Sequence, residues 1–203
     1  MKFRSLAIAG AGTLCFLLAG CIGGRPIHYY TINSPALPEA APKPDGPVLL
    51  IGRISTPEAL EDERIRYRAG SNEVGAYELD RWMERPAMMV QDLLLRVLRD
   101  SGKFRQVVEL SSSVTGDYLV RGRLSEFAEI DNPGIRTRIS LRLEMVDRKT
   151  GSPVWAQDYD RDEPVNGKTM RDVVLSMERN LQKVVGDAAS AIEAAQHTTG
   201  PGH

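Results

Sequence analysis

The ten residues TRISLRLEMV, at positions 137–146, decide the fold because apolar and polar side chains alternate along most of their length. Such an alternation predicts a β-strand with one buried face and one face in contact with water. This pattern is typical of an antiparallel sheet that is covered on a single side. The positions predicted to be buried are Ile139, Leu141, Leu143 and Met145.

Two neighbouring stretches extend this strand into a predicted three-strand meander. Residues 117–127 precede it, and residues 153–159 follow it after the turn sequence DRKTG. Residues 48–54 form a continuous apolar run, which is typical of a strand buried on both faces. The remaining predicted strands are the hairpin 64–68 and 74–79, the segment 104–110, and a short β-prone patch at 28–32 that could pair at a sheet edge.

Two segments have the apolar spacing of amphipathic helices. The first is 83–100, with Pro86 in its opening turn and Gly102 as its stop signal. The second opens at Thr169 and Asp172, which fit a capping box, and keeps an aliphatic and Met stripe as far as Ile192. The order of elements predicts an α+β fold, with a mostly antiparallel sheet and two amphipathic helices packed on one face.

The N-terminus has the anatomy of a secretory signal peptide. Lys2 and Arg4 precede the apolar run 6–18, which is shorter than the roughly 20 residues that span a bilayer. The run ends in Leu-Ala-Gly-Cys, which resembles a bacterial lipobox, so we expect residues 1–20 to be removed and Cys21 to carry lipid. The alternative is an ordinary signal peptide with a coincidental cysteine.

The rest of the chain divides by composition into a tether, one domain and a tail. Residues 21–47 are predicted to be a lipidated tether and Pro-rich linker, 48–195 a single α+β domain, and 196–203 a disordered tail. Without Lys2 and Arg4 the chain keeps 24 basic and 27 acidic residues. This slight excess of negative charge does not indicate a nucleic-acid-binding protein. Cys15 leaves with the signal and Cys21 is blocked by lipid, so no disulfide is predicted.

The sequence contains no recognisable catalytic constellation. His28, His197 and His203 are its only histidines and lie in the predicted tether or tail, and there is no G-x-S-x-G or Walker sequence. We therefore predict no enzyme activity, no cofactor and no metal site. The acidic runs at 58–63 and 158–163 are interpreted as a solvated charged turn and a charge-blunted sheet edge.

Asp80-Arg81-Trp82 leaves two interpretations open. In one, Trp82 packs under the start of the first helix while Arg81 pairs locally. In the other, Arg81 and Trp82 form a partner-binding anchor, because Trp and Arg are enriched at binding hot spots.

A series of short motifs extends over nearly all of the chain after Cys21. They are Tyr29-Tyr30-Thr31-Ile32, Ile65 to Arg68, Asn72 to Val74, Tyr77, Arg81-Trp82, Leu93 to Leu98, Ser101 to Phe104, Val107, Asp117-Tyr118, Gly122, Phe127, and Leu143 to Gly151. In these residues, their order and their spacing, the chain resembles the ABC-type transport auxiliary lipoprotein family, of the PqiC and YmbA type. In two places the chain departs from it: Leu60-Glu61-Asp62 stands where members often have Leu-Asp-Arg, and Met83-Glu84-Arg85-Pro86 stands where they usually have Ala-Glu-Pro-Pro.

The resemblance implies a non-enzymatic, palmitate-bearing lipoprotein that faces the periplasm and docks an MCE-domain protein of an ABC-type phospholipid transporter. It brings no catalytic residues and allows a homo-oligomer. Ile22, where an inner-membrane retention signal would place Asp, favours the outer membrane. The alternative is a structural lipoprotein of another envelope machine, for secretion or outer-membrane assembly, and an exported hydrolase comes third.

Overall fold

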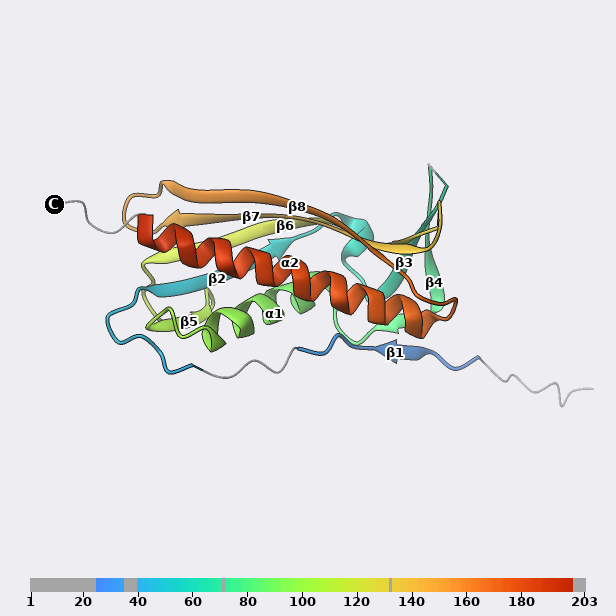
Figure 1. The fold of residues 1–203 in the computed structure, drawn as a ribbon, viewed down its shortest axis with the longest axis horizontal. Coiled ribbons are helices and arrows are strands. Elements are labelled where there is room, and N and C mark those ends of the chain that lie inside the picture. Colours follow the sequence, from blue (N-terminus) through green and yellow to red (C-terminus); the bar gives the residue numbers. More distant parts are fainter. Residues whose placement is uncertain (1–24, 35–39, 71, 132, 199–203) are drawn as a thin grey trace, which may run out of the picture.

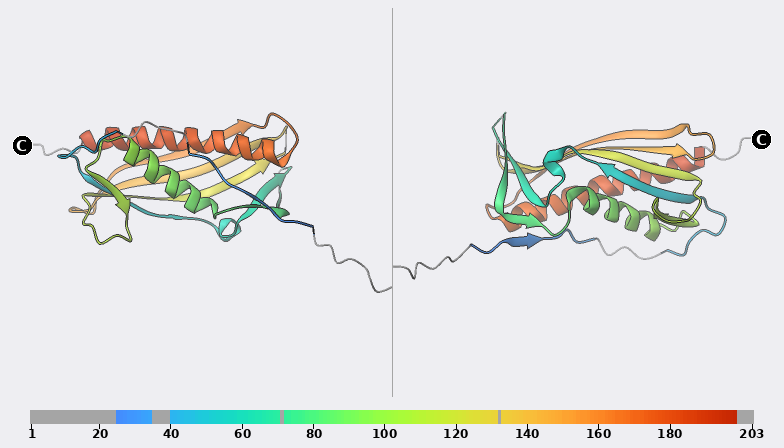
Figure 2. Two further views of the ribbon diagram at one scale, coloured as in Figure 1. Left: turned by 90° about the horizontal axis from the view of Figure 1, so that it is seen from below. Right: turned by 180° about the vertical axis from the view of Figure 1, so that it is seen from behind.

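The computed structural model describes residues 25–34, 40–70, 72–131 and 133–198, which form one mixed sheet of eight strands with two helices on one face (Figures 1 and 2). The predicted α+β fold is confirmed. The elements are β1 (His28–Tyr30), β2 (Val48–Ser55), the 3-10 turn η2 (Glu58–Leu60), β3 (Arg64–Ala69), β4 (Glu73–Trp82), α1 (Pro86–Asp100), β5 (Gln106–Glu109), β6 (Tyr118–Ile130), β7 (Arg136–Asp147), β8 (Pro153–Pro164) and α2 (Met170–Thr198).

The sheet forks at β6, its longest strand. On one side, β6 pairs with β7 and β7 with β8, both antiparallel, which confirms the predicted meander. On the other side, two parallel strands lie along β6 one after the other: β2 beside its first half and β3 beside its end. The first branch continues to β5, and the second continues through β4 to β1. The longest pairings are antiparallel as expected, while four shorter parallel pairings were not predicted.

The alternation along β7 sorts its side chains as the sequence predicts. Ile139, Leu141 and Leu143 are almost completely buried, whereas the residues between them lie on the open face of the sheet. The buried side chains join the apolar stripes of α1 and α2 in one core. Burial of these aliphatic groups is the main term that stabilises the head, at roughly 25 cal/mol per Å² of apolar surface.

Both helices begin and end at the signals that the sequence carries, with two differences. Helix α1 starts at Pro86, so Met83 precedes the helix and is exposed instead of joining its stripe. The residue before a proline is disfavoured in helical conformation, which explains the later start. In α2 the backbone N–H of Asp172 donates to Thr169, and Asp172 accepts the N–H of Thr169 in return, which confirms the capping box. The helix continues to Thr198, into the predicted tail, and residues 199–203 of that tail lie outside the described residues.

The described part of the predicted tether lies on the head. Strand β1 pairs in parallel with the end of β4, which confirms the expected edge pairing. The Asn33 backbone N–H donates to Glu178 of α2, and the Ala40 and Lys43 N–H groups donate to the carbonyls of Asp100 and Phe104. The sheet therefore begins well before Val48, and residues 40–47 are held along α1 and β5 rather than serving as a free spacer. Cys21 and the predicted signal lie outside the described residues. Within the described ranges, no helix has the length and hydropathy required to cross a bilayer.

Candidate functional site

Trp82, one of the two predicted contact residues, ends β4 with its side chain inside the core. Only 1% of it is exposed, and it packs against Phe127 of β6. A side chain buried this deeply cannot contact a partner while the head stays folded. The structure thus supports the packing interpretation of Trp82.

Arg81, the other predicted contact residue, faces away from Trp82 because successive side chains of a strand point to opposite faces. In register it lies between Tyr29 of β1 and Arg64 of β3. It is half-buried, and its Nε atom has no hydrogen-bond partner among the residues that the structure describes. A role for Arg81 in partner binding stays a prediction.

In the acidic turn after β2, the carboxylate of Asp62 is paired with arginines that follow it in the chain. Asp62 accepts hydrogen bonds from Arg64 at 2.6 Å and from Arg66 at 2.8 Å. Burial alone would raise the pKa of the Asp62 carboxyl, but the hydrogen bonds and charges of the two arginines outweigh it and lower this pKa. In the described ranges, no three His, Cys, Asp or Glu side chains are placed to hold a metal ion together.

The second acidic run forms a ladder of charges along β8, an edge strand of the sheet. Asp158 pairs with Arg142 at 2.7 Å, and Asp162 accepts from both Arg138 and Arg136 of β7. The ladder lies on the side of β7 and β8 that faces away from the core. Charged side chains along an edge oppose pairing with a foreign strand, as the sequence interpretation expected.

Two shallow depressions flank the first turns of α1. One, of about 540 Å³, lies at the fork of the sheet between the end of β2, η2 and α1. The other, of about 500 Å³, lies between α1 and the segment after β1. Each mixes apolar and charged side chains, with Arg53, Arg85 and Met88 in the first and Met83 and Arg96 in the second. Hydroxyl and carboxylate side chains line both depressions as well, and in the first the Ser55 hydroxyl donates to the backbone carbonyl of Gly122.

A partly buried polar cluster, which sequence reasoning missed, joins the β3–β4 hairpin to β6. The Tyr77 hydroxyl donates to Glu129 at 3.0 Å, and the Tyr67 ring lies 5.1 Å from that of Tyr77. Glu129 is only 6% exposed. Burial raises the pKa of its carboxyl, the Tyr77 hydrogen bond lowers it in part, and the charge of Asp131 raises it further. β6 also carries Arg121, Arg123 and Glu126, so the sequence pattern does not show that Glu129 alone among its charged residues is buried.

The comparisons with known proteins agree with this architecture. The sequence model of one protein family, described as the ABC-type transport auxiliary lipoprotein component, matches residues 30–189. A crystal structure of a Xanthomonas campestris protein of the family DUF330 superposes with a TM-score of 0.74 at 17% identity, covering 84% of this chain and 97% of that one. A second, uncharacterised protein gives a TM-score of 0.67 at 12% identity, with coverages of 83% and 99%.

A hypothetical protein from Chlamydia trachomatis gives a TM-score of 0.53 at 12% identity, with coverages of 74% and 98%. At these identities the structural likenesses establish the fold alone. No curated protein matches the chain in sequence. The family match spans most of the chain, from the end of β1 into the last turns of α2. The chain belongs to the family of ABC-type transport auxiliary lipoprotein components.

Proposed function

We propose that this chain is a non-enzymatic lipoprotein of the outer membrane that docks an MCE-domain protein and thereby serves an ABC-type phospholipid transport system. The match of residues 30–189 to a family of transport auxiliary lipoproteins carries the proposal. The lipobox at Leu18 to Cys21 supports the anchor, which we expect to be palmitate or a similar acyl chain. Ile22 supports the outer membrane, because it stands where an inner-membrane retention signal would place Asp.

The geometry supports a role in holding a partner at a fixed place. The helices and the forked sheet share one core, and backbone hydrogen bonds join the segment 40–47 to them, so we expect the head to move as one unit. The two depressions beside α1 are lined by a mixture of apolar and charged side chains, which suits contact with another protein. A rigid head on a lipid anchor positions another protein with little loss of conformational freedom on binding, which favours affinity.

Co-purification from membranes tests the proposal. The full chain with a C-terminal affinity tag is cross-linked in cells, solubilised from envelopes and purified, and its partners are identified by mass spectrometry. We expect an MCE-domain protein together with a permease and an ATPase. Recovery of secretion or outer-membrane assembly components in their place would contradict it and favour the structural-lipoprotein alternative.

The anchor is tested separately with Cys21→Ser. Metabolic labelling with a clickable fatty acid should mark the wild type and leave the variant unlabelled. Separation of the two membranes on a density gradient should then place the labelled wild type in the outer-membrane fraction. Equal labelling of both proteins would end the lipoprotein interpretation, and a peak in the inner-membrane fraction would end the outer-membrane assignment.

A further inference from the structure

Exposed apolar side chains gather at the sheet edge where the described chain begins. Ile27, Tyr29 and Met83 are 41%, 55% and 59% exposed. Tyr29 lies beside Arg81 in register, so both side chains point to the same face. The Met83 backbone N–H donates to the Tyr30 carbonyl at 2.7 Å, which brings the end of β4 against β1. Ile27, Tyr29 and Met83 are called the β1 edge patch below.

The charges around the β1 edge patch are mainly basic or already paired. Arg81 lies beside Tyr29 in register, Arg25 stands two residues before Ile27, and Arg85 stands two residues after Met83. Nearby carboxylates have partners: Asp80 accepts the Tyr30 hydroxyl at 3.0 Å, and Glu63 lies 3.6 Å from Arg85. Glu84 lines the depression beside α1 together with Arg96. Tyrosine with aliphatic and arginine neighbours is the combination enriched at membrane–water interfaces.

The length of chain between this patch and the predicted anchor is short. From Cys21 to Ile27 an extended chain reaches about 20 Å, at 3.3–3.6 Å per residue. Because β1 is hydrogen-bonded to β4, the patch cannot move away from the head to lengthen this tether. If Cys21 carries lipid, as the proposed function requires, the patch lies within that distance of the bilayer surface. A protein partner would have to enter this narrow space, whereas the membrane already borders it.

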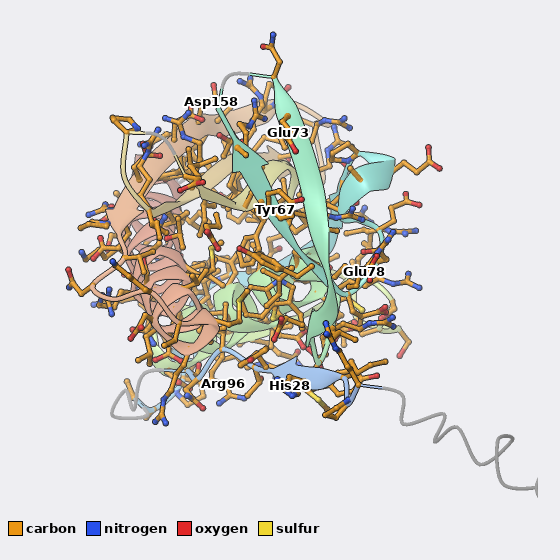
Figure 3. The ribbon with its side chains drawn as sticks, turned by 90° about the vertical axis from the view of Figure 1, so that its right-hand side faces the viewer. His28, Tyr67, Glu73, Glu78, Arg96 and Asp158 are labelled. Carbon is orange, nitrogen blue, oxygen red and sulfur yellow. The ribbon has the colours of Figure 1, made fainter. Side chains whose placement is uncertain are left out.

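We propose that the β1 edge patch contacts the headgroup region of the bilayer that holds the anchor, so that the head rests on this edge. The end that carries β5 and the start of β2 then points away from the membrane, since Figure 1 places it at the opposite end of the molecule from β1. Figure 3 looks onto the β1 end, where His28 lies at one margin and Glu73 of the β3–β4 hairpin at the opposite one. On this arrangement Arg81 faces lipid phosphates, which replaces its predicted role in binding a protein. Anchor and patch together give the two signals that stable membrane attachment needs.

Fluorescence quenching in vesicles tests this placement with the full lipidated chain. A cysteine is introduced at Tyr29 or Met83 and coupled to an environment-sensitive nitrobenzoxadiazole dye. Since Cys21 is blocked by lipid in the mature protein, the introduced thiol is the single site of labelling. The matched control is Leu110→Cys, an exposed apolar position that follows β5 at the other end. The labelled proteins are reconstituted in phosphatidylethanolamine–phosphatidylglycerol vesicles with and without headgroup-nitroxide lipid.

The proposal predicts a blue shift on reconstitution and quenching about twofold or more stronger at positions 29 and 83 than at 110. Equal quenching at all three positions overturns the patch contact while leaving the anchor and the partner intact. A blue shift without quenching identifies a protein, such as a second copy, as the occupant and likewise overturns it. Absence of fatty acid on Cys21 overturns the proposed lipoprotein function, and this inference with it. Circular dichroism of each variant verifies that the head is folded.

Discussion

Trp82 packs edge-on against Phe127, with ring centroids 5.6 Å apart and ring planes inclined by 72°. The two rings come from β4 and β6, which are separated in the sheet by β3. An edge-to-face pair adds about 0.5–1.5 kcal/mol to the stabilisation that burial of the rings provides. The contact therefore ties the outer branch of the fork to the central strand.

Trp82→Ala is expected to cost about 3–5 kcal/mol of unfolding free energy, because it leaves a large cavity in the core. Urea or thermal unfolding of the wild type and the variant measures this cost. Tyr29→Ala is the matched control: it also removes an aromatic ring, but from an exposed site, so we expect a change within about 0.5 kcal/mol. Equal unfolding curves for wild type and Trp82→Ala would show that Trp82 is not a core residue.

The buried carboxyl of Glu129 predicts a distinctive dependence of stability on pH. Its pKa is raised in the folded protein above the ordinary value of 4.5, so the folded state binds the proton more tightly than the unfolded state. Stability therefore falls as the pH rises through 4.5 and reaches its lower level above the raised pKa. Glu129→Gln removes this titration, so the stability of the variant relative to wild type should increase with pH.

Urea unfolding at a series of pH values from 3.5 to about 7.5 follows that difference across the window. Glu73→Gln, in the exposed part of β4, controls for the general effect of losing one negative charge. A difference that stays constant with pH would contradict a raised pKa at Glu129.

The sequence alone predicts the structure correctly where the signal lies in residues that are close together in the chain. In β7 the alternation alone gave the buried face, because neighbouring side chains of a strand always point to opposite faces. The start of α2 was equally predictable, since Thr169 and Asp172 satisfy each other within one turn. These signals depend on residues close together in the chain.

The sequence alone does not predict the features that depend on contacts between residues far apart in the chain. The fork exists because β2 and β3 both pair with β6, although β4, α1 and β5 lie between them in the chain, and no local pattern specifies which strands meet in parallel. The Pro-rich composition suggested a free linker, but backbone groups of Ala40 and Lys43 bond to the head, and backbone groups carry no sequence signature. Both interpretations of Trp82 stayed open for a similar reason: its burial is provided by Phe127, far along the chain.

Glu163, near the end of β8, predicts the opposite pH dependence from Glu129. Lys183 donates to its carboxylate at 2.7 Å and Arg179 at 3.4 Å, both from α2. The Lys183 hydrogen bond is the largest influence on the Glu163 pKa; burial opposes it, and the net shift is downward. The pair thus stabilises the folded state above about pH 4.5, and this stabilisation is lost as the pH falls through the lowered pKa.

Glu163→Gln should lower the unfolding free energy at neutral pH by roughly 1 kcal/mol, with the gap closing in acid. Equilibrium unfolding at neutral and acidic pH measures both values. Asp187→Asn is the comparison, because Asp187 also pairs with an arginine of β8 but its side chain is 63% exposed, and it should matter less. A gap for Glu163→Gln that widens in acid would be opposite to the predicted sign.

A substitution at Leu181, in the middle of α2, tests whether this helix is packed against the sheet. It is fully buried in the core shared with the sheet, whereas Leu175 on the same helix is 41% exposed. Leu181→Asp places a carboxylate among the apolar side chains of the core. Burying an unpaired charge costs several kcal/mol or forces its protonation. We expect this variant to unfold the head or to be recovered only as aggregate, while Leu175→Asp keeps a near wild-type melting curve. Circular dichroism and thermal unfolding of the two variants provide the comparison. If Leu181→Asp were as soluble and stable as Leu175→Asp, this face of α2 would have to be accessible in solution, and the core described for the head would be incorrect.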